Sequence, residues 1–381
     1  MRTLLALALL VALSALAVLG CGTSFPLPTE TRIGRGYSTD NSYQMVATWS
    51  FGDSVADILL TQGPGTQLFL LFHSGGPGIG TSPRGRVQGF AIKARPPTPA
   101  PLPGIEFRGL FVPAALCAGN SRVFVLDQGD TALARDPLTG RVSDLSLTWR
   151  VREFGLLGGD TLSTFTDTSM AFVRGVAADD QGRVYVSGSA IILIPDQQNP
   201  SIRTRSFLFR VYRYLRVVPG SVPPDRYMPG TDRWVRDLSY TVEEGSGVGT
   251  LNDPRGLYWA GAGVPGGSGL FAADFGKNWV QKLSDAVSST GFFRIDADSS
   301  TTLEGPTDVT ADRAGHIYIA DTGNQRVLRY DPDGRYVQRV DVELDSDGQP
   351  LADPVALAAD DSLVYVSDGQ ARKVVRYQRR K

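Results

Sequence analysis

Histidine and cysteine are scarce in this 381-residue chain, and neither sign of charge is in excess. It has two histidines, His73 and His316, and two cysteines, Cys21 and Cys117. Two histidines cannot supply the multi-histidine sets that many metal-dependent or acid–base enzymes use. The 38 Lys and Arg residues balance the 39 Asp and Glu residues, so the chain lacks the positive field that nucleic-acid binding requires. Nucleic acid is therefore not an expected partner.

The N-terminus has the pattern of an export signal. Arg2 precedes an apolar run over residues 4–19, which is the n-region and h-region of a signal peptide spanning residues 1–20. The run is short for a membrane-spanning helix, which needs roughly 20 apolar residues. The motif Val18-Leu19-Gly20-Cys21 resembles the lipobox of bacterial lipoproteins. A plain secretory signal that happens to end beside a cysteine is the alternative.

The lipobox resemblance implies that the mature chain begins at Cys21 and is acylated on that residue. Several acyl chains form a stable membrane anchor, and residues 21–42 would then be a tether to the rest of the chain. Gly22 follows Cys21, where lipoproteins retained in the inner membrane usually have Asp, so we expect an outer-membrane location in the cell envelope. Cys117 would be left without a disulfide partner, and a buried apolar role is expected for it.

Internal repeats occupy most of the remaining chain. The clearest begins at Pro306 and contains three short β-branched and aromatic runs, separated by Gly, Asp and Asn turns, with a fourth run at 336–340. This is the pattern of a four-stranded meander, the unit of a propeller blade. Further copies begin at Pro254 and Pro354, which lie 52 and 48 residues from Pro306. Weaker copies span residues 113–137, begin at Arg174, and begin near Val55, which makes six blades.

The first strand of the region is expected to complete the last blade. The copy that begins at Pro354 has only three strands before the chain ends. The run Tyr43–Gly52 precedes the first blade and resembles Trp149–Gly155, which we interpret as the outer strand of the second blade. Such an N-terminal strand would leave no open edge and would close the ring.

The segment Gly315-His316-Ile317-Tyr318-Ile319-Ala320-Asp321-Thr322-Gly323-Asn324-Gln325-Arg326-Val327 resembles the core of an NHL repeat. The sequence therefore predicts an all-β fold, a six-bladed β-propeller of NHL type over residues 43–381. Two insertions interrupt the repeats, at about 73–108 and 188–206. The second includes the apolar run Ile191–Pro195, which is expected in a loop.

The resemblance to NHL propellers implies that ligands bind where the loops between second and third strands meet the loops that enter the first strands. The candidate binding residues on that face are Asp274, Lys277, Asn278, Asn324 and Arg372, with Arg174, Arg255 and Asp308 near the mouth of the central channel. Asp127, Asp274, Asp321 and Asp368 recur at one repeat position, and because Asp favours turns, a structural role is expected for them. Arg174 and Arg255 would bind a carboxylate or phosphate, or would pair with Asp179, Asp253 or other neighbouring acids.

Two functions remain open. The poverty of catalytic residues favours a non-enzymatic platform that binds a protein or an envelope ligand and needs no cofactor. The alternative is a metal-dependent lactonase or hydrolase, because Glu304-Gly305-Pro306 resembles the metal-binding motif of gluconolactonase-like enzymes. In that case Glu304 would be a metal ligand.

Overall fold

The computed structural model describes residues 43–61, 67–73, 85–92, 101–128, 149–195, 203–284, 293–295 and 302–380. All of them belong to one compact unit, Ser38–Lys381. The expected signal peptide, Cys21 and the tether over 21–42 lie outside the described residues and stay predictions. The described part contains no helix long and apolar enough to cross a membrane.

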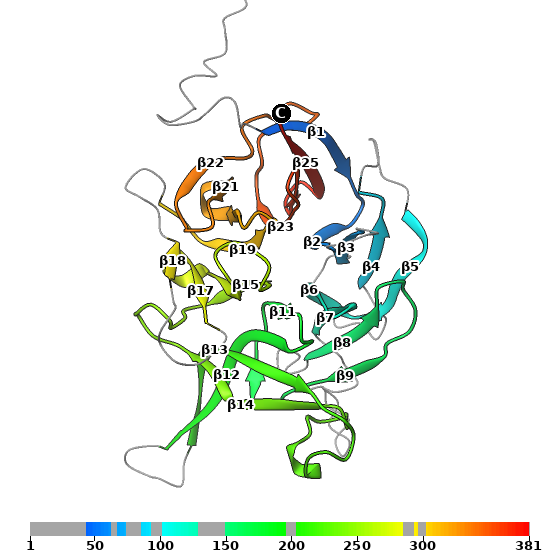
Figure 1. The fold of residues 1–381 in the computed structure, drawn as a ribbon, viewed down its shortest axis with the longest axis vertical. Coiled ribbons are helices and arrows are strands. Elements are labelled where there is room, and N and C mark those ends of the chain that lie inside the picture. The colour runs from blue at the N-terminus through cyan, green and yellow to red at the C-terminus, as the bar shows by residue number, and fades with distance from the viewer. Residues whose placement is uncertain are drawn as a thin grey trace, which may run out of the picture. The chain divides into compact units, whose positions relative to one another are not determined.

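Six antiparallel sheets are arranged around a central axis, with the first strand of each sheet innermost (Figure 1). The all-β, six-bladed propeller that the repeats predict is confirmed. Blade 1 comprises β2 (Ser54–Leu60), β3 (Leu68–His73), β4 (Gly85–Phe90) and β5 (Pro101–Leu110). Blade 2 comprises β6 (Val112–Gly119), β7 (Arg122–Gln128), β8 (Trp149–Gly155) and β9 (Ser163–Phe165).

Blade 3 has its first strand in two pieces. It comprises β10 (Met170–Ala171), β11 (Val176–Ala178), β12 (Val184–Pro195), β13 (Arg203–Arg216) and β14 (Trp234–Glu243), with the short 3-10 helix η3 (Pro224–Arg226) between the last two. Blade 4 comprises β15 (Pro254–Ala260), β16 (Gly269–Asp274), η4 (Phe275–Lys277), β17 (Trp279–Leu283) and β18 (Phe293–Ile295). Blade 5 comprises β19 (Pro306–Ala311), β20 (Ile317–Asp321), η5 (Thr322–Asn324), β21 (Arg326–Tyr330) and β22 (Tyr336–Arg339).

Blade 6 joins the two ends of the propeller. Its strands β23 (Pro354–Ala359), β24 (Leu363–Asp368) and β25 (Lys373–Arg379) come from the C-terminal region, and its outer strand is β1 (Tyr43–Ser50). β1 pairs with β25 from Tyr43 opposite Arg379 to Ser50 opposite Lys373. The expected closure by the N-terminal strand is therefore confirmed.

The core of the propeller lies between the sheets. Buried side chains of the described residues form six clusters, one for each pair of neighbouring blades. Because a blade packs against a neighbour on both faces, its inner strands are buried on both sides; every residue of β16 and β24 is buried. This explains why the sequence shows continuous apolar runs rather than strict alternation.

Three details of the expected blades are wrong. β8 pairs with both β7 and β9, so Trp149–Gly155 is the third strand of blade 2 and not its outer strand. The supposed insertion at 73–108 contains β4 and β5, the outer half of blade 1. Its segments 74–84 and 93–100 lie outside the described residues.

The supposed insertion at 188–206 is also mostly strand. β12 and β13 pair without interruption from Val184 opposite Tyr214 to Pro195 opposite Arg203, so the apolar run Ile191–Pro195 lies in a strand rather than a loop. The repeat pattern missed this because the two strands extend well beyond the length of the other blades. Only residues 196–202 of this segment lie outside the described residues.

Candidate functional site

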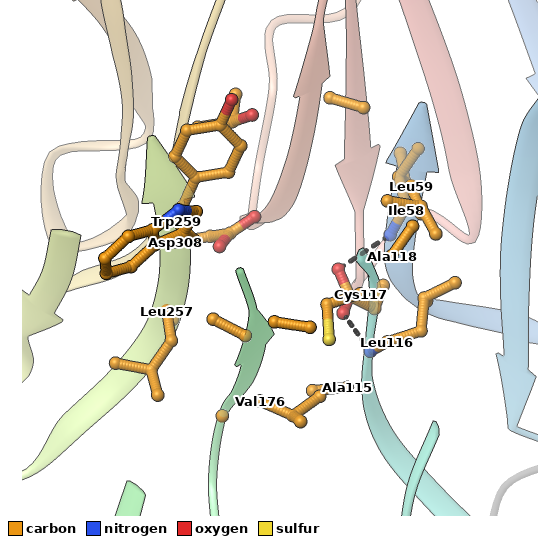
Figure 2. Close-up of a pocket in the computed structure, with 18 of the residues that line it drawn as sticks. Ile58, Leu59, Ala115, Leu116, Cys117, Ala118, Val176, Leu257, Trp259 and Asp308 are labelled. Carbon is orange, nitrogen blue, oxygen red and sulfur yellow. Dashed lines mark hydrogen bonds between the residues drawn. The ribbon is translucent and has the colours of Figure 1, made fainter. Parts of the chain in front are cut away.

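The innermost strands of all six blades surround a cavity of about 980 Å³. Most of its wall is aliphatic or small, as Figure 2 shows for the labelled residues Ile58, Leu59, Ala115, Leu116, Ala118, Val176 and Leu257. Cavities of this size are typical of sites that bind small molecules, and polar atoms form about as much of this cavity's surface as apolar atoms do. The polar side chains in the wall therefore define what the cavity can bind.

Two aspartates line the cavity from equivalent positions in β2 and β19. Each follows an irregularity in the pairing of its strand, between Val55 and Asp57 and between Pro306 and Asp308. Oδ2 of Asp57 accepts a hydrogen bond from the N–H of Leu116 in blade 2, and Oδ2 of Asp308 accepts one from the N–H of Leu357 in blade 6, both at 2.7 Å. Each carboxyl thus links its blade to the next one around the ring.

Both carboxyls lie deep in the ring, although the cavity leaves part of each accessible. Burial raises the pKa of Asp57 to about 7. Burial, together with the negative charge of Asp57, raises the pKa of Asp308 well above its ordinary value. Figure 2 shows the Asp308 carboxyl directed into the open space across from Ile58 and Leu116. Burial therefore favours the protonated form of both carboxyls, and a protonated carboxyl donates as well as accepts hydrogen bonds.

Arg174 and Arg255 lie in the cavity wall and share one carboxylate. Nε of Arg174 is 3.5 Å from Oδ1 of Asp253, and a terminal nitrogen of Arg255 is 3.0 Å from Oδ2. The Arg255 guanidinium also lies over the ring of Phe275, 3.3 Å from its centre. The side chains of Arg174 and Arg255 remain 46% and 32% exposed. Arg174, Arg255 and Asp253 form what we call the cavity rim. Its two guanidinium groups and one carboxylate together carry one net positive charge.

The recurring aspartates at the ends of the second strands fix the segments that enter the first strands. In four blades this carboxylate accepts a hydrogen bond from the backbone N–H two positions before the first-strand proline. The pairs are Asp127 with Phe111, Asp274 with Asn252, Asp321 with Glu304, and Asp368 with Ala352. These four aspartates are almost completely buried, so their carboxyls are used inside the fold. Burial raises the pKa of Asp127 to about 6 and that of Asp274 to about 7.

The other predicted binding residues also make internal contacts. Nζ of Lys277 donates to the carbonyl oxygens of Gly247 and Thr250, and Oδ1 of Asn278 accepts from the N–H of Gly305. The Asn324 amide donates to the Thr302 carbonyl and to Asp321, and Arg372 donates to the Gly52 carbonyl. Of the eight predicted binding residues, only Arg174, Arg255 and Asp308 line the cavity. Ligand binding by any of the eight stays a prediction.

Glu304 lies at the start of blade 5 with its side chain exposed. Its backbone N–H donates to Asp321, and its carbonyl accepts from the N–H of Gly323. No three His, Cys, Asp or Glu residues in the described ranges are grouped so that they could hold a metal ion. The geometry of these residues therefore offers no support for the metal-dependent alternative.

Two residues of this region escaped the sequence-based prediction of the site. Asp57 lies in the most irregular repeat, where the register of the first strand is not evident from sequence. Asp253 was considered only as one acid among several that Arg174 and Arg255 could pair with. An alignment of the first strands of all six blades would have shown that Asp57 and Asp308 occupy the same repeat position. The contact between Arg174 and Asp253 could not be found in this way, because it depends on how blades 3 and 4 pack.

Comparison with known proteins identifies one repeat and finds solved structures to which the chain is similar. Residues 303–330 match the model of the NHL repeat family. A search of curated protein sequences finds no match to the chain. Among solved structures, the chain is similar to a catalytically inactive virginiamycin B lyase from Staphylococcus aureus with quinupristin, at 10% identity and a TM-score of 0.47 over 89% of this chain and 99% of that one. It is also similar to luciferin-regenerating enzyme, at 11% identity and a TM-score of 0.48 over 87% and 95% of the two chains.

Proposed function

We propose that this six-bladed β-propeller, which has an NHL repeat in its fifth blade, is a non-enzymatic binding module of the cell envelope. It binds an anionic group of its ligand at the rim of the central cavity. The observation that supports this most strongly is the sharing of the single Asp253 carboxylate by Arg174 and Arg255. The rim therefore has an unsatisfied positive charge that is accessible from the cavity.

The surroundings of the two guanidinium groups favour anion binding. Asp253 and the Phe275 ring hold Arg255 in one orientation, so little conformational entropy is lost when it binds a ligand. A planar guanidinium donates two parallel hydrogen bonds to a carboxylate or phosphate. Because both side chains are only partly exposed to solvent, the interaction is stronger than it would be in open water.

Binding of small anions tests this proposal directly. We expect acetate and phosphate to bind the full-length chain in calorimetric titrations, and an Arg174→Gln/Arg255→Gln double variant to bind each of these anions at least about tenfold more weakly. Arg335→Gln is the matched control, because the Arg335 side chain is 79% exposed and its guanidinium pairs with the exposed Asp333. Equal affinities in the wild-type chain and the double variant would show that the anion binds elsewhere.

Attachment to the membrane through Cys21 is part of the same proposal. Its support is the Val18-Leu19-Gly20-Cys21 motif after an apolar run. Replacement of Cys21 by Ser should move the chain from the membrane to the soluble fraction, measured by ultracentrifugation of cell extracts. If Cys21→Ser stays with the membrane, the lipid anchor is wrong, although the binding site proposed at the cavity rim is unaffected.

A further inference from the structure

The residue that precedes each first strand is unusual in three consecutive blades. In blades 4 and 5 this residue is Asp253 and Gly305, directly before β15 and β19. In blade 3 the equivalent residue is Phe172, which lies between the two pieces of the first strand, β10 and β11. All three have a positive φ, of +66°, +53° and +50° respectively. Gly adopts this left-handed conformation freely, and Asp tolerates it. Phe172 does not, because its Cβ approaches the neighbouring carbonyl at a cost of roughly 1–2 kcal/mol. A phenylalanine at this position therefore needs another explanation.

Blade 3 makes room for Phe172 by interrupting its first strand. Ala171 lies opposite Ser189 and Val176 opposite Val186, so the four residues 172–175 face only two residues of β12. Gly188 allows this segment to lie close to β12, because a Cβ there would come within 3.0 Å of the Val173 Cα. Such a bulge changes the direction in which side chains point. Here it brings Phe172 and Arg174 to the wall of the same cavity.

The Phe172 ring remains partly exposed to solvent. It is 41% exposed, and its one ring contact is with Phe207 of β13, which is 42% exposed. The two ring centres are 5.3 Å apart at an angle of 75°, the edge-to-face arrangement of an aromatic pair. Phe172 thus lies with Arg174 on one segment of the cavity wall, and β13 supplies its half-exposed partner Phe207, which does not line the cavity. An apolar pair beside an accessible cation is complementary to a ligand with a flat apolar ring and an anionic group.

We infer that the ligand of the cavity rim is an aromatic carboxylate. Its carboxylate binds Arg174 and Arg255, and its ring packs against Phe172, whose ring is held in place by the contact with Phe207. This inference rests on the proposed function and adds the chemical class of the ligand. A carboxylate is favoured over a doubly charged phosphate because the two guanidinium groups and Asp253 together leave a single positive charge. The inference also explains the strained backbone of Phe172: the left-handed conformation is unfavourable, but it places the ring at the cavity rim.

A series of carboxylates that differ only in the attached group tests the inference. The probes are acetate, cyclohexanecarboxylate, benzoate and 2-naphthoate, titrated into the full-length chain by calorimetry. We expect 2-naphthoate to bind at least about tenfold more tightly than acetate, with cyclohexanecarboxylate weaker than benzoate. The Arg174→Gln/Arg255→Gln variant should lose affinity for all four probes.

Phe172→Gly separates ligand binding from folding. Glycine relieves the left-handed strain, so the melting temperature should stay close to that of the wild-type chain, while the preference for 2-naphthoate over acetate should disappear. Phe207→Ser should have the same effect on this preference. Leu238→Ser is the control, because Leu238 is an exposed apolar residue of β14 that does not line the cavity.

The possible results are distinguishable. If acetate and 2-naphthoate bind equally, or if Phe172→Gly retains the preference for the aryl probes, the aromatic inference is overturned and the anion site stands. If Phe172→Gly lowers the melting temperature strongly without changing the relative affinities, Phe172 serves the fold and the inference is again overturned. If none of the four carboxylates binds, both the inference and the proposed anion site are wrong.

Discussion

Aspartate performs two different tasks in this propeller, according to where its carboxyl lies. Asp321 and Asp368, at the ends of second strands, are buried and accept hydrogen bonds from the backbone that enters the first strands. Asp57 and Asp308 lie in the wall of the central cavity, where burial raises their pKa values. The first task builds the blade, and the second places in the cavity two carboxyls whose protonated form is favoured by burial.

The raised pKa of Asp57 predicts a dependence of stability on pH. Its pKa is about 7 in the folded chain and about 4 in the unfolded chain, so the folded chain holds this proton more tightly. The stability that Asp57 contributes is present below about pH 4 and is lost as the pH rises toward 7. We expect the wild-type chain to lose on the order of 2 kcal/mol more than Asp57→Asn between pH 4.5 and 7.5, measured by urea unfolding.

Asp232→Asn serves as the control for this measurement, because Asp232 is 68% exposed. It should leave the pH profile of the wild-type chain unchanged. Identical pH profiles for the wild-type chain and Asp57→Asn would mean that the Asp57 carboxyl is not perturbed by its position in the ring.

At the scale of elements, the geometry of the cavity rim depends on how closely the first strands approach one another. Gly175 precedes β11 and Gly256 lies in β15, and both occupy the position where blades 1 and 5 have Asp57 and Asp308. A Cβ at Gly256 would lie 2.5 Å from Oδ1 of Asp308. A Cβ at Gly175 would lie 2.1 Å from the carbonyl oxygen of Arg255. The absence of side chains at these positions allows Arg174 and Arg255 to reach the same carboxylate.

Replacement of Gly175 by Ala should therefore disturb both packing and binding. The obstructing atom belongs to the backbone and cannot move aside, so we expect a loss of about 2 kcal/mol of unfolding free energy and weaker anion binding. Urea unfolding and anion titration measure the two effects. Gly263→Ala is the matched control, because a Cβ there has nothing within 4 Å. Equal stability of the two variants would contradict the close approach of blades 3 and 4.

At the scale of the whole molecule, the ring is closed by a strand from the opposite end of the chain. β1 covers the edge of β25 and buries Tyr43, Ala47 and Trp49 between blade 6 and its neighbours. The hydroxyl of Tyr43 is 2.8 Å from that of Tyr318 in blade 5. β1 therefore completes blade 6 and also two of the clusters between blades.

Removal of β1 should open the propeller. A chain that begins at residue 51 lacks β1 and exposes the unpaired edge of β25. The loss of the buried Trp49 side chain by itself should lower the free energy of unfolding by about 3–5 kcal/mol. We expect a lower melting temperature and aggregation, measured by circular dichroism and light scattering. A chain that begins at residue 39 keeps β1 and should melt like the full-length chain. If both truncated chains have the same melting temperature, β1 does not close the ring.

The regular blades could be predicted because the residue pattern within each repeat shows where its strands lie. The prolines at 254, 306 and 354 begin first strands, and the following apolar runs and aspartates mark the second strands, since these residues serve the same contacts in every blade. The outer strands of blade 1 and the long strands of blade 3 could not be predicted this way. Their lengths and spacing depart from those of the other blades, so comparison with the regular repeats does not show where these strands begin and end.

The sequence alone determined the class of fold, the number of blades and the closing strand, because these follow from local patterns repeated along the chain. The tertiary structure decided which residues meet at the cavity. Arg174 and Arg255 share Asp253 only because two glycines let neighbouring blades approach. Phe172 meets Phe207 only because β13 returns along β12, the strand with which β10 also pairs. Contacts between blades depend on distances across the ring, and no local pattern in the sequence specifies those distances.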